Sequence, residues 1–192
     1  GCCIFCWDRK IPLCENDQMD NEAAQALGSR FKHSRYFIQW LFTLRIRVGN
    51  ILITVSIVSF SDQEQDILAI RHRVFTVEQQ VDASLDFDGL DGLATQALAY
   101  SDGIAIGTGR ILTDGHIGRI AVLKEYRGKG VGSDIIQTLL NQAEKRGLPK
   151  VFLGAQVTAI PFYEKLGFSA AGENYMEANI LHTPMERTIG GL

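Results

Sequence analysis

The chain has 192 residues, a hydrophobic fraction of 46%, a charged fraction of 21% and a net charge of −3. This composition predicts a globular, core-forming chain, and its charge excludes a global field that would recruit nucleic acid or an anionic membrane. The apolar segment at residues 36–44 is far shorter than the roughly twenty residues that span a bilayer, and no secretion signal is recognisable. We therefore expect a cytoplasmic protein that binds neither nucleic acid nor membrane.

The cysteines are confined to the N-terminal end of the chain, at Cys2, Cys3, Cys6 and Cys14. A disulfide framework would be spread across the fold, so this pattern argues against a secreted scaffold. Cys3 and Cys6 have the spacing of half a zinc site, but no second pair follows; the alternative is free thiols, and we expect no metal. Residues 1–50 lack a clean period apart from a helical pattern at 21–27, so we interpret them as an N-terminal extension of a domain at 51–192.

From residue 51 onward the predicted elements are separated by turn signals. Residues 52–58 are β-branched and predict a strand. Ser61 and Glu64 have the spacing of a capping box at the start of a helix whose apolar positions continue to Phe75. The acidic segment 82–92 is a predicted loop. Strands are predicted at 96–100, 104–112 and 116–122 with tight turns between them, which would leave His116 exposed.

The second half of the domain begins with a glycine-rich turn and an amphipathic helix from residue 131 to a stop at 146–147. A strand at 151–153, a short helix at 158–166 and strands from 168 and at 182–189 follow. The order of these elements predicts an α+β fold with a mixed sheet.

The glycine-rich turn reads Arg127-Gly128-Lys129-Gly130-Val131-Gly132-Ser133. Glycines allow backbone N–H groups to approach a ligand closely, and the start of a helix adds partial positive charge. Together with the two cations, these features predict a phosphate or pyrophosphate site. Ser133 stands where a Rossmann motif has its third glycine, and the P-loop signature is absent. The alternative is a structural turn with solvated cations.

Here the chain resembles the GNAT superfamily of N-acetyltransferases, over about residues 51–192. The further matching segments, several of them typical of the ElaA/YjcF-like branch, are Ile117–Val122, Pro161–Phe168, Arg73–Phe75, Glu78–Gln79, Asp88–Asp91, Gly107–Arg110, Ala155–Val157 and Glu177–His182. The resemblance implies a mostly antiparallel, splayed central sheet flanked by helices, in which the strand at 151–155 diverges.

The resemblance also implies acetyl-CoA as the co-substrate. The strand at 120–122 would pair with the pantetheine chain, and the N–H groups of the glycine-rich turn would hold the pyrophosphate. The implied binding residues are Ile120, Ala121, Val122, Arg127, Gly128, Lys129, Gly130, Val131, Gly132, Ser133 and Gln156.

An amine acceptor is mostly protonated at neutral pH, so a general base or a desolvating pocket is needed. The resemblance implies Tyr163 as the acid that protonates the leaving thiolate. Glu78 and His182 are both candidates for the base, and the sequence leaves the choice open. The domain lacks cysteine and a nucleophilic serine elbow, which favours direct transfer over a covalent enzyme.

The acceptor is expected to be a small-molecule or peptide amine. Asp82, Asp86, Asp88 and Asp91 favour a cationic acceptor, or they form a solvated acidic loop. Likewise, Arg110 and Arg119 would bind an acidic acceptor or pair with Asp86 or Asp88. A homodimer through the terminal strands is compatible with the pattern. The alternatives to an enzyme are a non-catalytic, regulatory acyl-CoA-binding module and an interaction domain that docks through residues 1–50.

Overall fold

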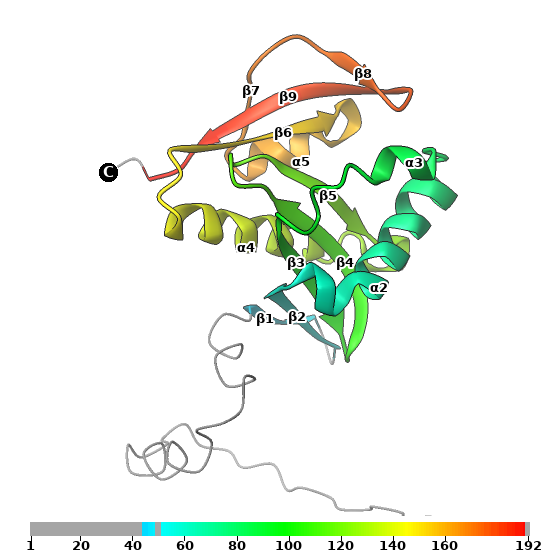
Figure 1. Ribbon diagram of the computed structural model, residues 1–192. Coiled ribbons are helices and arrows are strands. Elements are labelled where there is room, and N and C mark those ends of the chain that lie inside the picture. The colour runs from blue at the N-terminus through cyan, green and yellow to red at the C-terminus, as the bar shows by residue number, and fades with distance from the viewer. Residues whose placement is uncertain (1–43, 49–50, 191–192) are drawn as a thin grey trace, which may run out of the picture. The chain divides into compact units, whose positions relative to one another are not determined.

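The computed structural model describes residues 44–48 and 51–190, so the cysteines and the helix predicted at 21–27 lie outside the described residues. A five-stranded antiparallel sheet runs in chain order (Figure 1). Its strands are β1 (Leu44–Val48), β2 (Ile51–Val58), β3 (Thr95–Ser101), β4 (Ile104–Ile111) and β5 (Ile117–Val122). The sequence assigned β1 to the N-terminal extension, yet β1 pairs with β2 along its length. The domain boundary at residue 50 stays a prediction.

A second, smaller sheet follows the helix at Val131–Lys145. It has the order β6 (Lys150–Gln156), β9 (Ile180–Thr188), β7 (Ser169–Ala170), and β8 (Tyr175–Glu177) forms a hairpin with β9. β8 was not predicted, because three exposed residues give too short a pattern to recognise as a strand. All pairings between named strands are antiparallel in both sheets, so the predicted α+β class with a mostly antiparallel sheet is confirmed.

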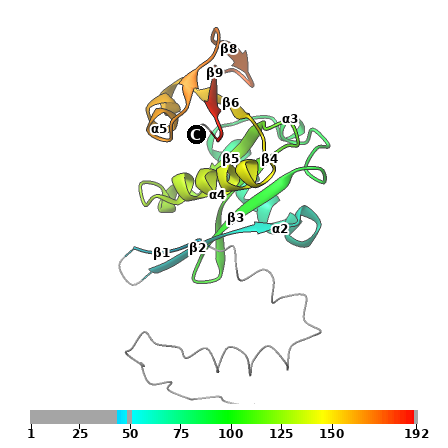
Figure 2. The same ribbon diagram turned by 90° about the vertical axis from the view of Figure 1, so that its left-hand side faces the viewer.

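Two helices cover opposite faces of the five-stranded sheet, α2 (Phe60–Arg71) and α4 (Val131–Lys145) (Figures 1 and 2). Alternate residues of a strand point to opposite faces, and β3 shows this: Ala97 and Ala99 pack in the cluster with α4, whereas Leu98 packs with α2. α4 ends as predicted, since Gly147 adopts a φ of 67° and the N–H of Leu148 returns to the carbonyl of Ala143 at 3.0 Å.

The start of α2 differs from the prediction. The helix begins at Phe60, and the Ser61 hydroxyl bonds to the neighbouring Asp62 carboxylate at 3.5 Å instead of capping the backbone. The predicted capping box is therefore wrong. Gln63 has non-helical angles (φ −127°, ψ 21°) and accepts a hydrogen bond from the Tyr100 hydroxyl at 2.9 Å, so a tertiary contact accompanies the kink that breaks the box geometry.

After α2 the chain widens into a π-helical segment, η2 (His72–Glu78), and then forms the short α3 (Ala83–Asp86) inside the predicted loop. The remaining short elements are η3 (Lys124–Tyr126), η4 (Val157–Ala159) and α5 (Ile160–Lys165). Within the described residues, we find no helix with the length and hydropathy needed to cross a membrane.

The two sheets meet at one end and part at the other. The N–H of Phe152 in β6 donates to the carbonyl of Gly115 at 3.2 Å, and a single bridge joins Phe152 to His116. Past this point β5 and β6 belong to different sheets, which is the predicted splay. His116, predicted to be exposed, is half-buried and stacks on Phe152 with ring centroids 5.2 Å apart; the contact between sheets covers it.

Candidate active site

A cavity of about 560 Å³ opens where the two sheets part. Its walls come from η2 and α3, from β5, from the end of β6, from α5 and from the β8–β9 hairpin. The residues that line it include Gln79, Asp86, Arg110, His116, Arg119, Ile120, Gly154, Gln156, Tyr163, Tyr175, Glu177, Ala178, Ile180 and His182.

β5 presents a free edge at this cavity. One edge pairs with β4, and past His116 no strand among the described residues pairs with the other. Gly109 of β4 lies opposite two residues of β5, Arg119 and Ile120, and Arg119 has a φ of 55°. This bulge increases the local twist of the strand. An edge with unpaired N–H and C=O groups is suited to an extended ligand that adds as a strand.

The glycine-rich turn follows β5 and leads into α4. Gly128 and Gly130 have φ angles of 73° and 86°, which non-glycine residues rarely adopt. Gly130 is the N-cap residue of α4, which begins at Val131, and the N–H groups of the first turn lack partners within the helix. The Lys129 ammonium lies 5.1 Å from the centre of the Tyr126 ring. The geometry is that of an anion site.

Arg127 is held by two partners in this turn. Its Nε donates to the carbonyl of Val122 at 2.9 Å, and its two Nη atoms donate to the carboxylate of Glu78 at 2.5 and 2.7 Å. The hydrogen bond from Arg127 lowers the pKa of Glu78. Tyr163 and His182 line the cavity, whereas Glu78 does not, and its carboxylate pairs with Arg127 of the glycine-rich turn.

Tyr163 lies on α5 and is buried, with 9% of its surface exposed. Its ring makes edge contacts with Phe162 and Phe168 at centroid distances of 4.9 and 5.9 Å. Burial raises the pKa of its hydroxyl to about 12, so the phenol carries its proton at neutral pH. As the residue lines the cavity, it can donate a hydrogen bond there.

His182 lies on β9 and contacts the same cavity. Its Nδ1 is 2.9 Å from the carbonyl oxygen of Ile180. A carbonyl only accepts, so Nδ1 carries the hydrogen and the neutral ring keeps Nε2 as a proton acceptor. Tyr175, opposite His182 in the hairpin, stacks on its ring with centroids 5.7 Å apart.

Sequence reasoning missed Tyr175. Its hydroxyl lies against Gly154 of β6, where a Cβ would overlap it. The one available signal in the sequence was the spacing of Tyr175 and Glu177, which places both side chains on one face of a strand. Gln156, expected at the co-substrate site, lies at the end of β6 and donates from Nε2 to Oε1 of Gln79 at 3.1 Å. This bond links the smaller sheet to η2.

Three arginines and three aspartates form a closed ring beneath the cavity, in which each charge contacts two of opposite sign. In order around the ring they are Arg71, Asp86, Arg119, Asp88, Arg110 and Asp91. We call this set the charge ring. Arg110 and Arg119 thus pair with aspartates, as one of the two alternatives from the sequence had it. Of the acidic loop, Asp86, Asp88 and Asp91 are neutralised, and Asp82 bonds to Ser84.

The free edge of β5 and the phenol of Tyr163 lie at one cavity, and the glycine-rich turn follows β5. This arrangement is suited to an acyltransferase that draws on an acyl-CoA thioester. Comparison with known proteins agrees. Residues 59–189 match the family described as acetyltransferase (GNAT) domain, and the chain belongs to this family. Its members use acyl-CoA as co-substrate and amines as acceptors.

Three relatives illustrate the similarity. The Uncharacterized N-acetyltransferase YjcF of Bacillus subtilis is 34% identical over 128 residues, covering 65% of this chain and 91% of YjcF. Among solved structures, an acyl-CoA N-acyltransferase from Pseudomonas aeruginosa has a TM-score of 0.64 at 30% identity, covering 70% of this chain and 99% of that one. Escherichia coli ElaA has a TM-score of 0.63 at 30% identity with the same coverage.

Proposed function

We propose that the protein transfers an acetyl group from acetyl-CoA directly to the amine of a small molecule or peptide. The observation that carries this proposal is the cavity itself, because it joins the free edge of β5 to Tyr163 on α5 and His182 on β9. The donor and the acceptor can therefore enter from different sides and meet between the sheets.

The donor would bind along β5 and the glycine-rich turn. The backbone of Ile120, Ala121 and Val122 offers the strand edge for the pantetheine chain. The N–H groups from Arg127 to Ser133 would bind the pyrophosphate, and Lys129 would add a full charge. The helix end contributes about 0.3–1 kcal/mol, so the several N–H contacts must supply most of the affinity.

The chemistry needs a neutral amine. With a pKa near 10.4, about one acceptor in a thousand is neutral at neutral pH, a deficit of about 4 kcal/mol. In the proposed step the amine nitrogen attacks the thioester carbonyl carbon, the C–N bond forms, and the C–S bond breaks. His182 Nε2 takes the proton from the amine, and the Tyr163 hydroxyl donates toward the sulfur that leaves as thiolate.

The high pKa of Tyr163 limits its part in this step. A phenol with a pKa of about 12 does not readily surrender a proton to a thiolate whose own acid has a pKa near 8.5. The hydroxyl would therefore act chiefly as a hydrogen-bond donor while charge builds on sulfur. The proton that completes the thiol comes in the end from the amine, so that the reaction balances.

Glu78 stays the second candidate for the base. Its ion pair with Arg127 and its lowered pKa make its carboxylate a weak proton acceptor. If Glu78 instead orders the turn, the variant Glu78→Gln will weaken acetyl-CoA binding and leave the pH dependence of kcat unchanged. If Glu78 is the base, the same variant will change the pH dependence of kcat and leave acetyl-CoA binding unchanged.

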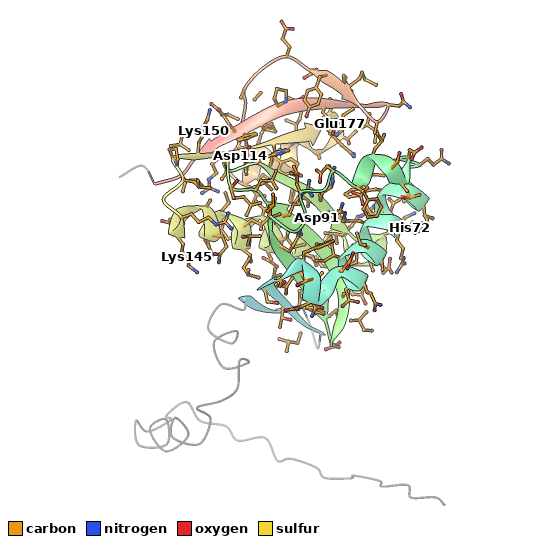
Figure 3. All side chains as sticks on the ribbon, in the orientation of Figure 1. His72, Asp91, Asp114, Lys145, Lys150 and Glu177 are labelled. Atoms are coloured by element: carbon orange, nitrogen blue, oxygen red, sulfur yellow. The ribbon has the colours of Figure 1, made fainter. Side chains whose placement is uncertain are left out.

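Calorimetric titration with acetyl-CoA tests the donor site, with NADH and ATP as control ligands. We expect heat specific to acetyl-CoA, lost in Arg127→Glu and kept in Lys145→Glu. The control makes the same charge change at the far end of α4, about 20 Å away by helix rise (Figure 3). The absence of a binding heat with all three ligands would overturn the proposal. Binding of acetyl-CoA without release of the CoA thiol in the presence of any amine would favour the regulatory acyl-CoA-binding module. The cytoplasmic location and the homodimer stay predictions.

A further inference from the structure

The charged residues that line the cavity are Asp86, Arg110, Arg119 and Glu177. The first three belong to the charge ring, whose three positive and three negative members cancel. Glu177 stands outside the ring: no ion pair or hydrogen bond of its side chain occurs within the described part of the chain. Among the described residues that line the cavity, Glu177 is therefore the charged side chain without a partner of opposite sign.

Glu177 is the last residue of β8 and lies in the β8–β9 hairpin (Figure 3). Burial raises the pKa of Tyr175, and the charge of Glu177 raises it further. The same carboxylate acts on His116 across the cavity, where it and Asp114 oppose the lowering of the His116 pKa by burial and by Arg110 and Arg119. Glu177 lines the cavity from β8, and Ile117 to Ile120 of β5 line it from the other sheet.

The register of the hairpin sets the distance between Glu177 and His182. Glu177 lies opposite Ile180, and Tyr175 lies opposite His182. Glu177 and His182 are therefore diagonal neighbours on one face of the hairpin, and the Cα atoms of such neighbours lie about 7–8 Å apart. The two nitrogens of an extended four-carbon diamine lie about 6 Å apart, from bond lengths near 1.5 Å. One nitrogen can reach His182 while the other contacts the carboxylate.

We propose that Glu177 selects acceptors that carry a second cationic group about four carbons from the reacting amine. This inference rests on the proposed function and names its class of substrate. The second ammonium ion pairs with Glu177, and the first amine gives up its proton at His182 and receives the acetyl group. Glu177 is a specificity-determining residue and takes no part in proton transfer.

Three acceptors of matched length test the inference: putrescine, butylamine and γ-aminobutyrate, whose far ends are cationic, neutral and anionic. Thiol release with acetyl-CoA gives kcat and KM for each. We expect the lowest KM for putrescine and the highest for γ-aminobutyrate. Because Glu177 is exposed, Glu177→Gln should raise the KM for putrescine only about 1.4-fold to fivefold, the range of an exposed ion pair, and leave the KM for butylamine unchanged.

Glu173→Gln is the matched control, since it removes the same charge from an exposed residue of the neighbouring loop that does not line the cavity. It should leave all three KM values unchanged. Equal use of the three acceptors by the unaltered protein would overturn the inference, and so would a Glu177→Gln effect of the same size on each, because that would indicate a base.

A failure of the proposed function is distinguishable from a failure of the inference. If no amine is acetylated, calorimetric titration of the same three amines decides the inference alone. Binding of putrescine that is stronger than that of butylamine and is lost in Glu177→Gln supports a site for the second cation. Binding that ignores the far end of the ligand, or no binding, overturns it.

Discussion

Replacing Arg71 with methionine is expected to destabilise the protein by about 3–5 kcal/mol, the cost of removing one partner from a buried ion pair. Arg71 is fully buried, with 0% of its side chain exposed. Its guanidinium donates to Asp86 Oδ2 and Asp91 Oδ1 at 2.8 Å each, and to the Asp86 carbonyl at 2.6 Å. Methionine fills much of the same space but leaves these acceptors without that donor.

The magnitude follows from two independent estimates. Hydrogen bonds to charged groups contribute about 1.5–3 kcal/mol each, and a charge pair at 4 Å is worth about 4 kcal/mol at an effective dielectric constant of 20. Asp86 and Asp91 each keep one other arginine, Arg119 and Arg110, so the cost stays below the sum of three lost bonds.

Arg73→Met is the matched control, two residues further along the chain. Arg73 pairs with Glu125 at 3.1 Å, but 58% and 52% of the two side chains are exposed. An exposed pair contributes about 0.2–1 kcal/mol. Urea unfolding of the full chain, followed by circular dichroism, gives both values from the shift in midpoint at constant slope. A cost below about 1 kcal/mol for Arg71→Met would refute the reasoning.

The charge ring also predicts how stability depends on pH. A hydrogen bond from Arg110 lowers the pKa of Asp88; burial raises the pKa of Asp91, but hydrogen bonds from Arg110 and Arg71 outweigh it and lower that pKa. Carboxylates with a lowered folded-state pKa stabilise above their unfolded value, near 3.9, and lose this stabilisation as the pH falls below it. The free energy of unfolding should therefore drop below about pH 4, and less steeply in Arg71→Met.

Three further predictions concern the cavity. Gly154→Ala places a Cβ on the Tyr175 hydroxyl, so kcat/KM for amines should fall while acetyl-CoA affinity by calorimetry is unchanged; a fully active variant would contradict the packing. Tyr163→Phe should lower kcat about 10²-fold or more at unchanged acetyl-CoA affinity; an unchanged kcat would remove its proposed role. Ala178 has a φ of 49° in the β8–β9 turn, so Ala178→Gly should raise the free energy of unfolding by about 0.5–1 kcal/mol, whereas a loss measured by urea unfolding would argue against strain there.

Features that depend on neighbours in the chain could be predicted from the sequence. The glycine-rich turn before α4 is one, because closely spaced glycines and the helix that follows directly produce it. The end of α4 at Gly147 and the consecutive strands β3, β4 and β5 are others. The capping box predicted at Ser61 is wrong because it depends on a contact that is distant in the chain. The helix kinks at Gln63, which accepts a hydrogen bond from Tyr100.

The partners of the charged residues were decided by the tertiary structure alone. Glu78 and Arg127 are 49 residues apart in the chain, and their bidentate pair turns a candidate base toward the donor site. The sequence left Arg110 and Arg119 two alternatives, an acidic acceptor or Asp86 and Asp88, and the packing of the loop against β4 and β5 selected the aspartates. Asp86 and Asp91 are buried in ion pairs, so the expectation of a solvated acidic loop is wrong for them. Local sequence sets backbone conformation, whereas the partner of a long charged side chain depends on which distant strand lies beside it. For the same reason only the tertiary structure shows that Glu177, among the described residues lining the cavity, has no partner of opposite charge.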